Sequence, residues 1–97
     1  MRSKINLAFI YGSIARAEER AGSDIDLFVV GEISLLEVTR ALGKVQRDLR
    51  REVNPAVYPV DEFHRGMKQK DNFLKEVTAG PKIWLVGDQD ELERLVG

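Results

Sequence analysis

Two aspartates, Asp24 and Asp26, are the residues of this 97-residue chain with the clearest capacity for chemistry. They flank Ile25 in a run of Ile, Leu, Phe and Val that is typical of a β-strand, whose side chains alternate between two faces. Both carboxylates therefore fall on one face, where they repel each other unless a cation lies between them. Mg²⁺ is the hard cation that suits carboxylate and phosphate oxygens. The alternative is a solvated pair in which Asp24 caps the start of the strand.

Gly12 and Ser13, separated from Asp24 by ten residues, form a second group that could bind a ligand. They follow an apolar run and precede a run of helix formers. A strand that turns directly into a helix offers backbone N–H groups to an anion, and Gly12 lets that backbone come close. Ser13 adds a hydroxyl, and Arg16, one turn into the helix, could reach a phosphate oxygen. The alternatives are an ordinary turn and a surface pair between Arg16 and Glu19.

Taken together, the two groups suggest one site. A helix N-terminus would hold triphosphate oxygens, while the adjacent strand would supply carboxylates for metal ions that contact the same phosphates. This is the arrangement needed for in-line displacement at phosphorus.

The elements that must hold these residues alternate between strand and helix patterns. Apolar, β-branched runs predict strands over residues 5–11, 24–30, 52–58 and 82–86, the third of them broken or at an edge because of Pro55. Helices are predicted over 14–20, about 35–50, one or two short segments within 61–78, and from 88 to the C-terminus. Ser34 and Glu37 have the spacing of a capping box at the start of the second helix. This order predicts a sheet with helices packed on it, in an α/β or α+β fold.

The segments Gly12–Arg16 and Ser23–Leu27 resemble the motif of the minimal nucleotidyltransferases of the DNA polymerase beta superfamily. That motif joins a Gly-Ser turn to an Asp-x-Asp strand across about ten residues. The resemblance implies a small mixed sheet of about four strands flanked by helices. It also implies that Gly12 and Ser13 contact phosphate and that Asp24 and Asp26 ligate Mg²⁺ and act in catalysis.

One position departs from the family pattern. Catalytic members carry a third carboxylate on a neighbouring strand, and Asn54 stands at the corresponding place. An amide offers a carbonyl oxygen to a metal but cannot act as a base. Glu52, two residues earlier and on the same face of a regular strand, could supply the missing carboxylate, or it could pair with Arg50 or Arg51. Glu52 and Asn54 are therefore both candidate metal ligands.

The resemblance also implies a function. Chains of this size resemble the antitoxin half of HEPN-type toxin–antitoxin pairs, which modify a tyrosine of the toxin. We therefore expect an Mg²⁺-dependent transfer of a nucleotidyl group, AMP from ATP, to a hydroxyl on a partner protein. The alternative is a degenerate module that binds a nucleotide or a protein without turnover.

Composition excludes several other classes. The net charge of −1 and the absence of Cys argue against a nucleic-acid coat protein, a membrane-surface binder, disulfides and zinc ribbons. The length predicts a single domain over residues 1–97, which we expect in the cytoplasm, with an apolar patch covered in a complex or a homo-oligomer. The run 47–51 is expected to end a helix. His64 is expected to have no metal or base role, and Phe73 and Trp84 are expected to fill the core.

Overall fold

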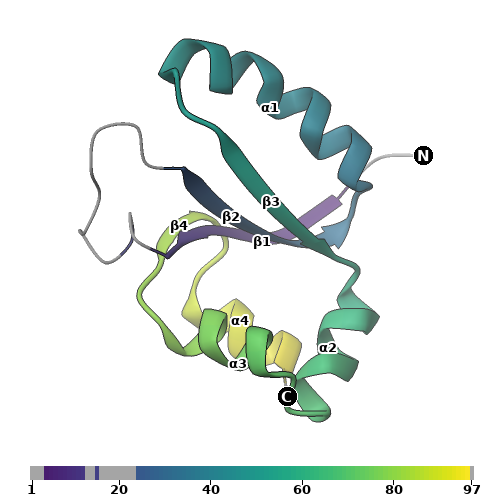
Figure 1. Ribbon diagram of the computed structural model, residues 1–97. Coiled ribbons are helices and arrows are strands. Elements are labelled where there is room, and N and C mark those ends of the chain that lie inside the picture. The colour runs from purple at the N-terminus through teal and green to yellow at the C-terminus, as the bar shows by residue number, and fades with distance from the viewer. Residues whose placement is uncertain (1–3, 13–14, 16–23, 97) are drawn as a thin grey trace.

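A four-stranded sheet forms the centre of the computed structural model, which describes residues 4–12, 15 and 24–96 (Figure 1). The strands lie in the order β3-β2-β1-β4. Their bounds are β1 (Lys4–Tyr11), β2 (Ile25–Glu32), β3 (Val53–Tyr58) and β4 (Ile83–Val86). β1 is antiparallel to β2 and β4, whereas β2 and β3 are parallel. The sheet is therefore mixed, as the resemblance implied.

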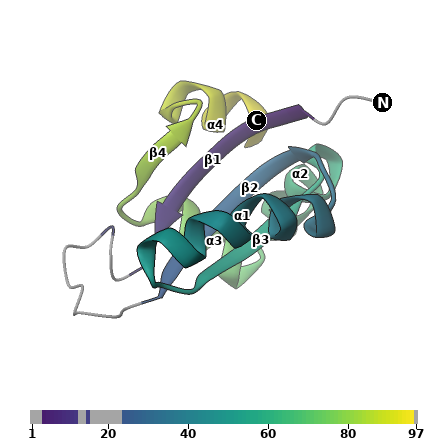
Figure 2. The same ribbon diagram turned by 90° about the horizontal axis from the view of Figure 1, so that it is seen from above.

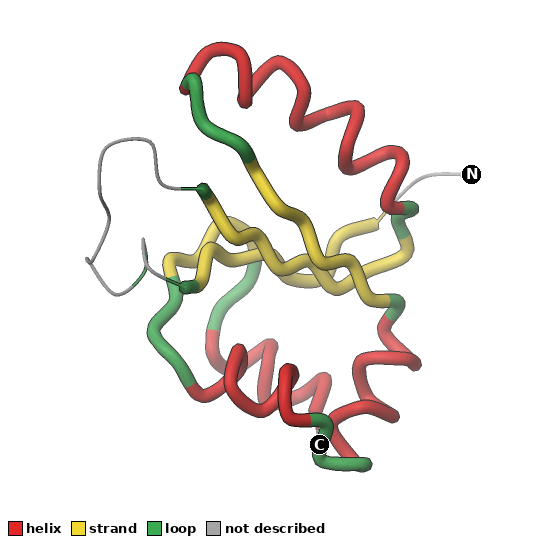
Figure 3. Tube along the Cα trace, viewed as in Figure 1, coloured by secondary structure: helices red, strands yellow, loops and turns green. Residues whose placement is uncertain are grey.

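Helices cover both faces of the sheet (Figures 1 and 3). Their bounds are α1 (Leu35–Leu49), α2 (Val60–Lys68), α3 (Asn72–Ala79) and α4 (Gln89–Val96). α1 lies on one face, and α2, α3 and α4 lie on the other. Seen from above, α1 runs over β2 and β3 and leaves β1 and β4 beside it (Figure 2). The face of the sheet on which a side chain projects thus decides which helices it meets.

The alternation of side chains along β1 and β2 produces two separate apolar clusters. Phe9 and Phe28, with their ring centroids 5.2 Å apart, are fully buried together with Phe63 on the face that α2, α3 and α4 cover. Leu27 and Val29 belong to the smaller cluster on the α1 face. Asp26 has the same parity as Phe28, so its side chain projects toward the face of the three helices.

The parallel pairing of β2 with β3 requires a crossover connection, and α1 provides it. The predicted capping box starts this helix: the Ser34 hydroxyl accepts a hydrogen bond from the Glu37 backbone N–H at 3.1 Å. The helix ends at Arg50, whose φ of 54° is left-handed. The crossover brings the start of β3 beside the start of β2, which sets Asn54 opposite Asp26.

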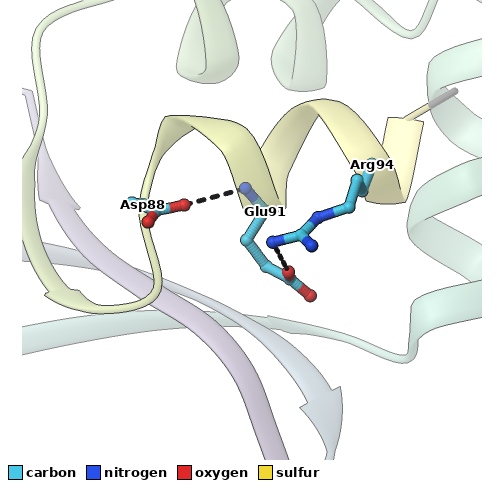
Figure 4. Close-up of polar contacts among 3 residues, drawn as sticks. All are labelled: Asp88, Glu91 and Arg94. Atoms are coloured by element: carbon cyan, nitrogen blue, oxygen red, sulfur yellow. Dashed lines mark hydrogen bonds and ion pairs between the residues drawn. The ribbon is translucent and has the colours of Figure 1, made fainter.

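The two last helices are also capped by side chains. Asp71 accepts from the Leu74 N–H at 3.1 Å at the start of α3. Asp88 accepts from the Glu91 N–H at 2.9 Å at the start of α4, and Glu91 pairs with Arg94 at 2.7 Å (Figure 4). These bonds satisfy backbone donors that the first turn of a helix leaves unpaired.

The predicted elements are confirmed wherever the structure describes the chain, with shifts of one or two residues at their ends. Pro55 lies in β3, an edge strand, where the missing N–H is tolerated. The segment 61–78 contains two helices, and the predicted helix over 14–20 lies outside the described residues. Within the described ranges, every helix is too short or too polar to cross a membrane.

Candidate functional site

The predicted site residues that the structure describes lie at the end of the sheet where β1 ends and β2 and β3 begin. Tyr11 of β1 pairs with Asp26 of β2, and Asp26 pairs with Asn54 of β3. The three residues form a row across three strands. Asp24 lies just before β2, and its carboxylate accepts a hydrogen bond from Asn54, the residue opposite Asp26. The Asp-x-Asp segment thus brings both aspartates to this end of the sheet, around Asn54.

Gly12 lies directly against one of these carboxylates. Its φ is +77°, and a Cβ atom built on it would lie only 2.5 Å from Oδ2 of Asp26. A side chain at this position would both strain the backbone and displace the carboxylate. The glycine is therefore required because the turn after β1 passes so close to Asp26.

Asn54 contacts the other carboxylate. Its Nδ2 donates a long hydrogen bond, 3.4 Å, to Oδ2 of Asp24, and both side chains are exposed. The two ends of an amide are assigned from such contacts, so a half-turn of the side chain would present its oxygen to a cation instead. Two carboxylates and an amide oxygen are all hard donors, and this set fits a divalent cation.

Glu52 lies just before β3, and its backbone carbonyl accepts from the Ile25 N–H at 2.9 Å. Its side chain is exposed. Among the described residues there is no group of three or more Asp, Glu, His or Cys side chains placed to hold a metal ion. Glu52 as a third ligand therefore stays a prediction, and Asn54 is the group that the structure brings to Asp24.

A pocket of about 240 Å³ opens beside Asp26. One wall consists of Tyr11, Gly12 and Asp26 from the ends of β1 and β2. The other wall comes from α3 and the segment after it, and it consists of Phe73, Glu76, Val77, Gly80 and Pro81. This second wall was not predicted, although the spacing of Phe73, Glu76 and Val77 is that of one helix face.

Phe73 corrects an expectation from the sequence. Its ring lies 6.1 Å from that of Tyr11 and 6.3 Å from that of Phe28, but 39% of the residue is exposed. It therefore borders the core instead of filling it. Trp84, by contrast, packs edge-on against Phe9 at 5.0 Å, as expected for a core residue.

Two groups around the pocket have perturbed acidity. Burial, followed by the Asp26 carboxylate and Tyr58, raises the pKa of Tyr11 above its ordinary value. Burial lowers the pKa of Lys82, whose ammonium group donates to the carbonyls of Thr78 and, at 2.9 Å, Gly80. Lys82 thereby fixes the end of α3 and the segment that forms the far wall of the pocket.

The remaining predicted residues lie elsewhere. Ser13 and Arg16 are outside the described residues, so their predicted phosphate contacts stay predictions. His64 contacts the Leu95 carbonyl at 3.2 Å, which joins α2 to α4 away from the aspartates. The basic run ends α1, with Arg47 in the last turn, as expected.

The sequence and the fold both match known proteins. The pattern of the family described as polymerase beta nucleotidyltransferases matches residues 1–83. A crystal structure of a toxin–antitoxin complex with AMP-PNP has a similar chain, with a TM-score of 0.66 and 18% identity over 96% of this chain and 69% of that one. A second similar chain comes from a crystal structure of the MntA–HpeT toxin–antitoxin, with a TM-score of 0.63 and 16% identity over 96% of this chain and 69% of that one. That protein is a mutant in which two aspartates, two positions apart, are changed to glutamate. No curated protein sequence matches. At these identities the two structures show a shared fold.

Proposed function

Because the chain belongs to the polymerase beta nucleotidyltransferase family, we propose that it transfers AMP from ATP to a hydroxyl group of a partner protein, with Mg²⁺ as cofactor. One observation carries this proposal: Asn54 lies opposite Asp26 and contacts Asp24 at the end of the sheet, and the Gly12 turn lies against Asp26. A toxin–antitoxin structure of the same fold was determined with AMP-PNP, an ATP analogue, which supports ATP as the donor.

Asp24 and Asp26 would hold the metal, with the Asn54 amide oxygen as a third donor. Bound Mg²⁺ would offset the charge of the two carboxylates and stabilise negative charge on the phosphates. The backbone at Gly12 approaches Asp26 closely enough to bring phosphate oxygens and carboxylates to one place, and Ser13 and Arg16 would add donors beyond it.

The transfer forms a bond from the acceptor oxygen to the α-phosphorus and breaks the bond to pyrophosphate, which leaves. The acceptor hydroxyl must also lose a proton. Asn54 cannot take it, since an amide has no basicity. The proton therefore passes to water or to the exposed carboxylate of Asp24, and we expect turnover to be slow relative to nucleotide binding.

The acceptor would belong to another protein. Both similar structures are of toxin–antitoxin proteins, which supports a toxin as the partner. From the family resemblance we further propose that this toxin is of the HEPN type and that the chain acts as its antitoxin in the cytoplasm. The edge strand β4 exposes three apolar side chains, Ile83, Leu85 and Val86, and such a surface is typical of a binding site for another chain. A second copy of this chain could also cover it.

Asn54 favours one second candidate, a module that binds nucleotide without transferring it. In that case Asp24, Asp26 and Gly12 retain their role in binding, and the missing carboxylate marks lost turnover. Replacing Asn54 with Asp separates the two candidates, because only the second would gain transfer that the natural chain lacks.

The proposal is tested by titrating ATP into the protein by calorimetry, with Mg²⁺ and then with EDTA. We expect binding only with Mg²⁺, and its loss in Asp26→Asn but not in Asp48→Asn, an exposed aspartate of α1. In a second assay the protein is incubated with a co-expressed HEPN-type toxin and labelled ATP. The toxin should become labelled when the label is on the α-phosphate of ATP, and it should stay unlabelled when the label is on the γ-phosphate. ATP binding that is equal in EDTA, or unchanged in Asp26→Asn, would contradict the proposed site.

A further inference from the structure

Asp26 lies beside the pocket, whereas Asp24 lies at the open surface. Asp26 and Gly12 line the pocket, whereas Asp24 and Asn54 do not, and both of these are exposed. The pair of carboxylates therefore borders a pocket at one end and open solvent at the other. A protein acceptor is large and would need to approach from the open surface at Asp24. The pocket beside Asp26 would then be available to a part of the nucleotide.

The size of the pocket suits such a part. Its volume of about 240 Å³ is below the ~300–1,000 Å³ of pockets that enclose a whole drug-sized ligand. The phosphates would lie at Gly12 and Asp26, at the mouth. The base and sugar are then the groups that remain to fill the space between the β1 end and α3.

Phe73 gives this pocket an aromatic wall that is held in place from behind. Its ring lies beside those of Tyr11 and Phe28, the residue lines the pocket, and 39% of it stays exposed. The neighbouring Leu74 is 2% exposed and anchors α3 in the core, and Asp71 caps the helix. An exposed aromatic side chain on a fixed helix is suited to stacking, since every nucleobase offers a flat π-face.

The far wall suits the same ligand. Gly80 and Pro81 have no long side chains and are held by the bonds from Lys82 to the carbonyls of Thr78 and Gly80. Glu76 contributes a carboxylate that accepts hydrogen bonds, and the amino groups of bases and the hydroxyls of ribose donate them.

We propose that this pocket binds the nucleoside of the donor nucleotide and that the base stacks on Phe73. The inference rests on the proposed function, which supplies the triphosphate at Gly12 and Asp26, and adds to it a site for the base. Phe73 is a substrate-binding residue in this scheme, and its ring adds affinity for the nucleoside without touching the phosphates.

The test compares Mg²⁺-ATP with Mg²⁺-tripolyphosphate, which carries the same phosphate chain without base or sugar. Calorimetry would measure both ligands on the natural chain, on Phe73→Leu, which keeps bulk without a ring, and on Phe73→Tyr, which keeps the ring. Leu36→Ala, an exposed apolar residue on α1, is the matched control, and thermal melting confirms that each variant is folded.

We expect ATP to bind the natural chain more tightly than tripolyphosphate does. Phe73→Leu should weaken ATP by about 5- to 150-fold, the usual contribution of a base stacked on an aromatic ring, and leave tripolyphosphate within about twofold. Phe73→Tyr and Leu36→Ala should bind ATP as the natural chain does.

The outcomes separate the inference from the proposed function. If neither ligand binds the natural chain, the proposed function fails and the inference fails with it. If ATP binds with Mg²⁺ but Phe73→Leu leaves its affinity unchanged, the inference is overturned while the proposed function stands. Equal losses for ATP and tripolyphosphate also overturn it, because Phe73 would then act only through the shape of the phosphate site.

Discussion

Replacement of Gly12 with Ala tests the close approach of the β1 turn to Asp26. The φ of Gly12 is +77°, and the new Cβ would lie 2.5 Å from Oδ2 of Asp26, whereas real Cβ atoms essentially never come within 3.0 Å. The carboxylate, which is the end of the Asp26 side chain, must therefore move away from Gly12 by at least about 0.5 Å. The substitution thus perturbs both the backbone and one proposed metal ligand.

Each effect has an expected size. A left-handed backbone costs a residue with a Cβ about 1–2 kcal/mol, so the melting temperature of a chain this small should fall by about 4–16 °C. Metal sites tolerate errors in ligand distance of only about 0.2 Å, and disturbing the groups that position a ligand costs about 10- to 100-fold in metal affinity. Gly12→Ala should therefore weaken Mg²⁺-dependent ATP binding by about that factor, measured by calorimetry beside a thermal melt.

Gly87 provides the matched control. Its φ is +80°, and a Cβ there would lie 3.1 Å from the Asn6 carbonyl oxygen and 3.2 Å from Cβ of Leu7, away from Asp26. Gly87→Ala should lower the melting temperature by a similar amount and leave ATP affinity unchanged. If Gly12→Ala binds Mg²⁺-ATP as tightly as Gly87→Ala does, the contact between the turn and Asp26 has no role in the site, and the reasoning is refuted.

Three further predictions concern the neighbours of this contact. Asn54→Asp sets a second carboxylate against Asp24 near the surface, so in EDTA it should lower the free energy of unfolding by about 1 kcal/mol or less. Mg²⁺ should reverse this loss in a melting assay. A loss that Mg²⁺ leaves unchanged would speak against a cation shared by the two carboxylates. The raised pKa of Tyr11 means that the folded state holds this proton more tightly than the unfolded state, so the stabilisation is complete below the ordinary value of 10.0 and is lost as pH rises through the raised pKa. Tyr11→Phe should accordingly flatten the alkaline fall of the free energy of unfolding in urea titrations, and an unchanged slope would contradict the shift. Asp71→Ala removes the cap of α3 and should lower the free energy of unfolding by about 1 kcal/mol. Because the turn that carries Phe73 would fray, the substitution should reduce the affinity for ATP more than the affinity for tripolyphosphate. Equal reductions would argue against the placement of Phe73.

Local sequence patterns predicted the helices and strands because the residues that start or end most of these elements lie within or next to them in the sequence. The Ser34 cap and the alternation of Asp26 with Leu27 along β2 are short-range features, and both are confirmed. The division of 61–78 into two helices is less visible, because no Gly or Pro stands at the break after Lys68, and Gly66 lies within α2. Instead Lys70 takes a φ of 58°, and Asp71 then starts the next helix. A left-handed lysine has no recognisable pattern in a sequence, so only the Asp71 cap, which was not among the predictions, could have indicated the break.

The pocket could not be predicted for a different reason. Its two walls are about fifty residues apart in sequence, at Asp26 and at Phe73, and only the packing of α3 under the sheet brings them together. Helical periodicity marked Phe73 as apolar and hence as a core residue. Whether such a residue lies inside the core or at its border depends on what packs over it, and this is a tertiary property.

The two carboxylates differ in their surroundings, and under the proposed function this difference would separate binding from transfer. Asp26 is half-buried between Gly12 and the pocket, where it would help to hold the nucleotide. Asp24 is exposed beside Asn54, on the side from which the proposed protein acceptor would approach. A change at Gly12 or Phe73 should therefore alter ATP affinity, whereas a change at Asn54 should alter transfer to the acceptor far more than affinity, since only transfer requires a group that can accept a proton. ATP affinity and the rate of transfer should be measured in the same variants. If the two carboxylates had the same role, affinity and transfer would change together in every variant.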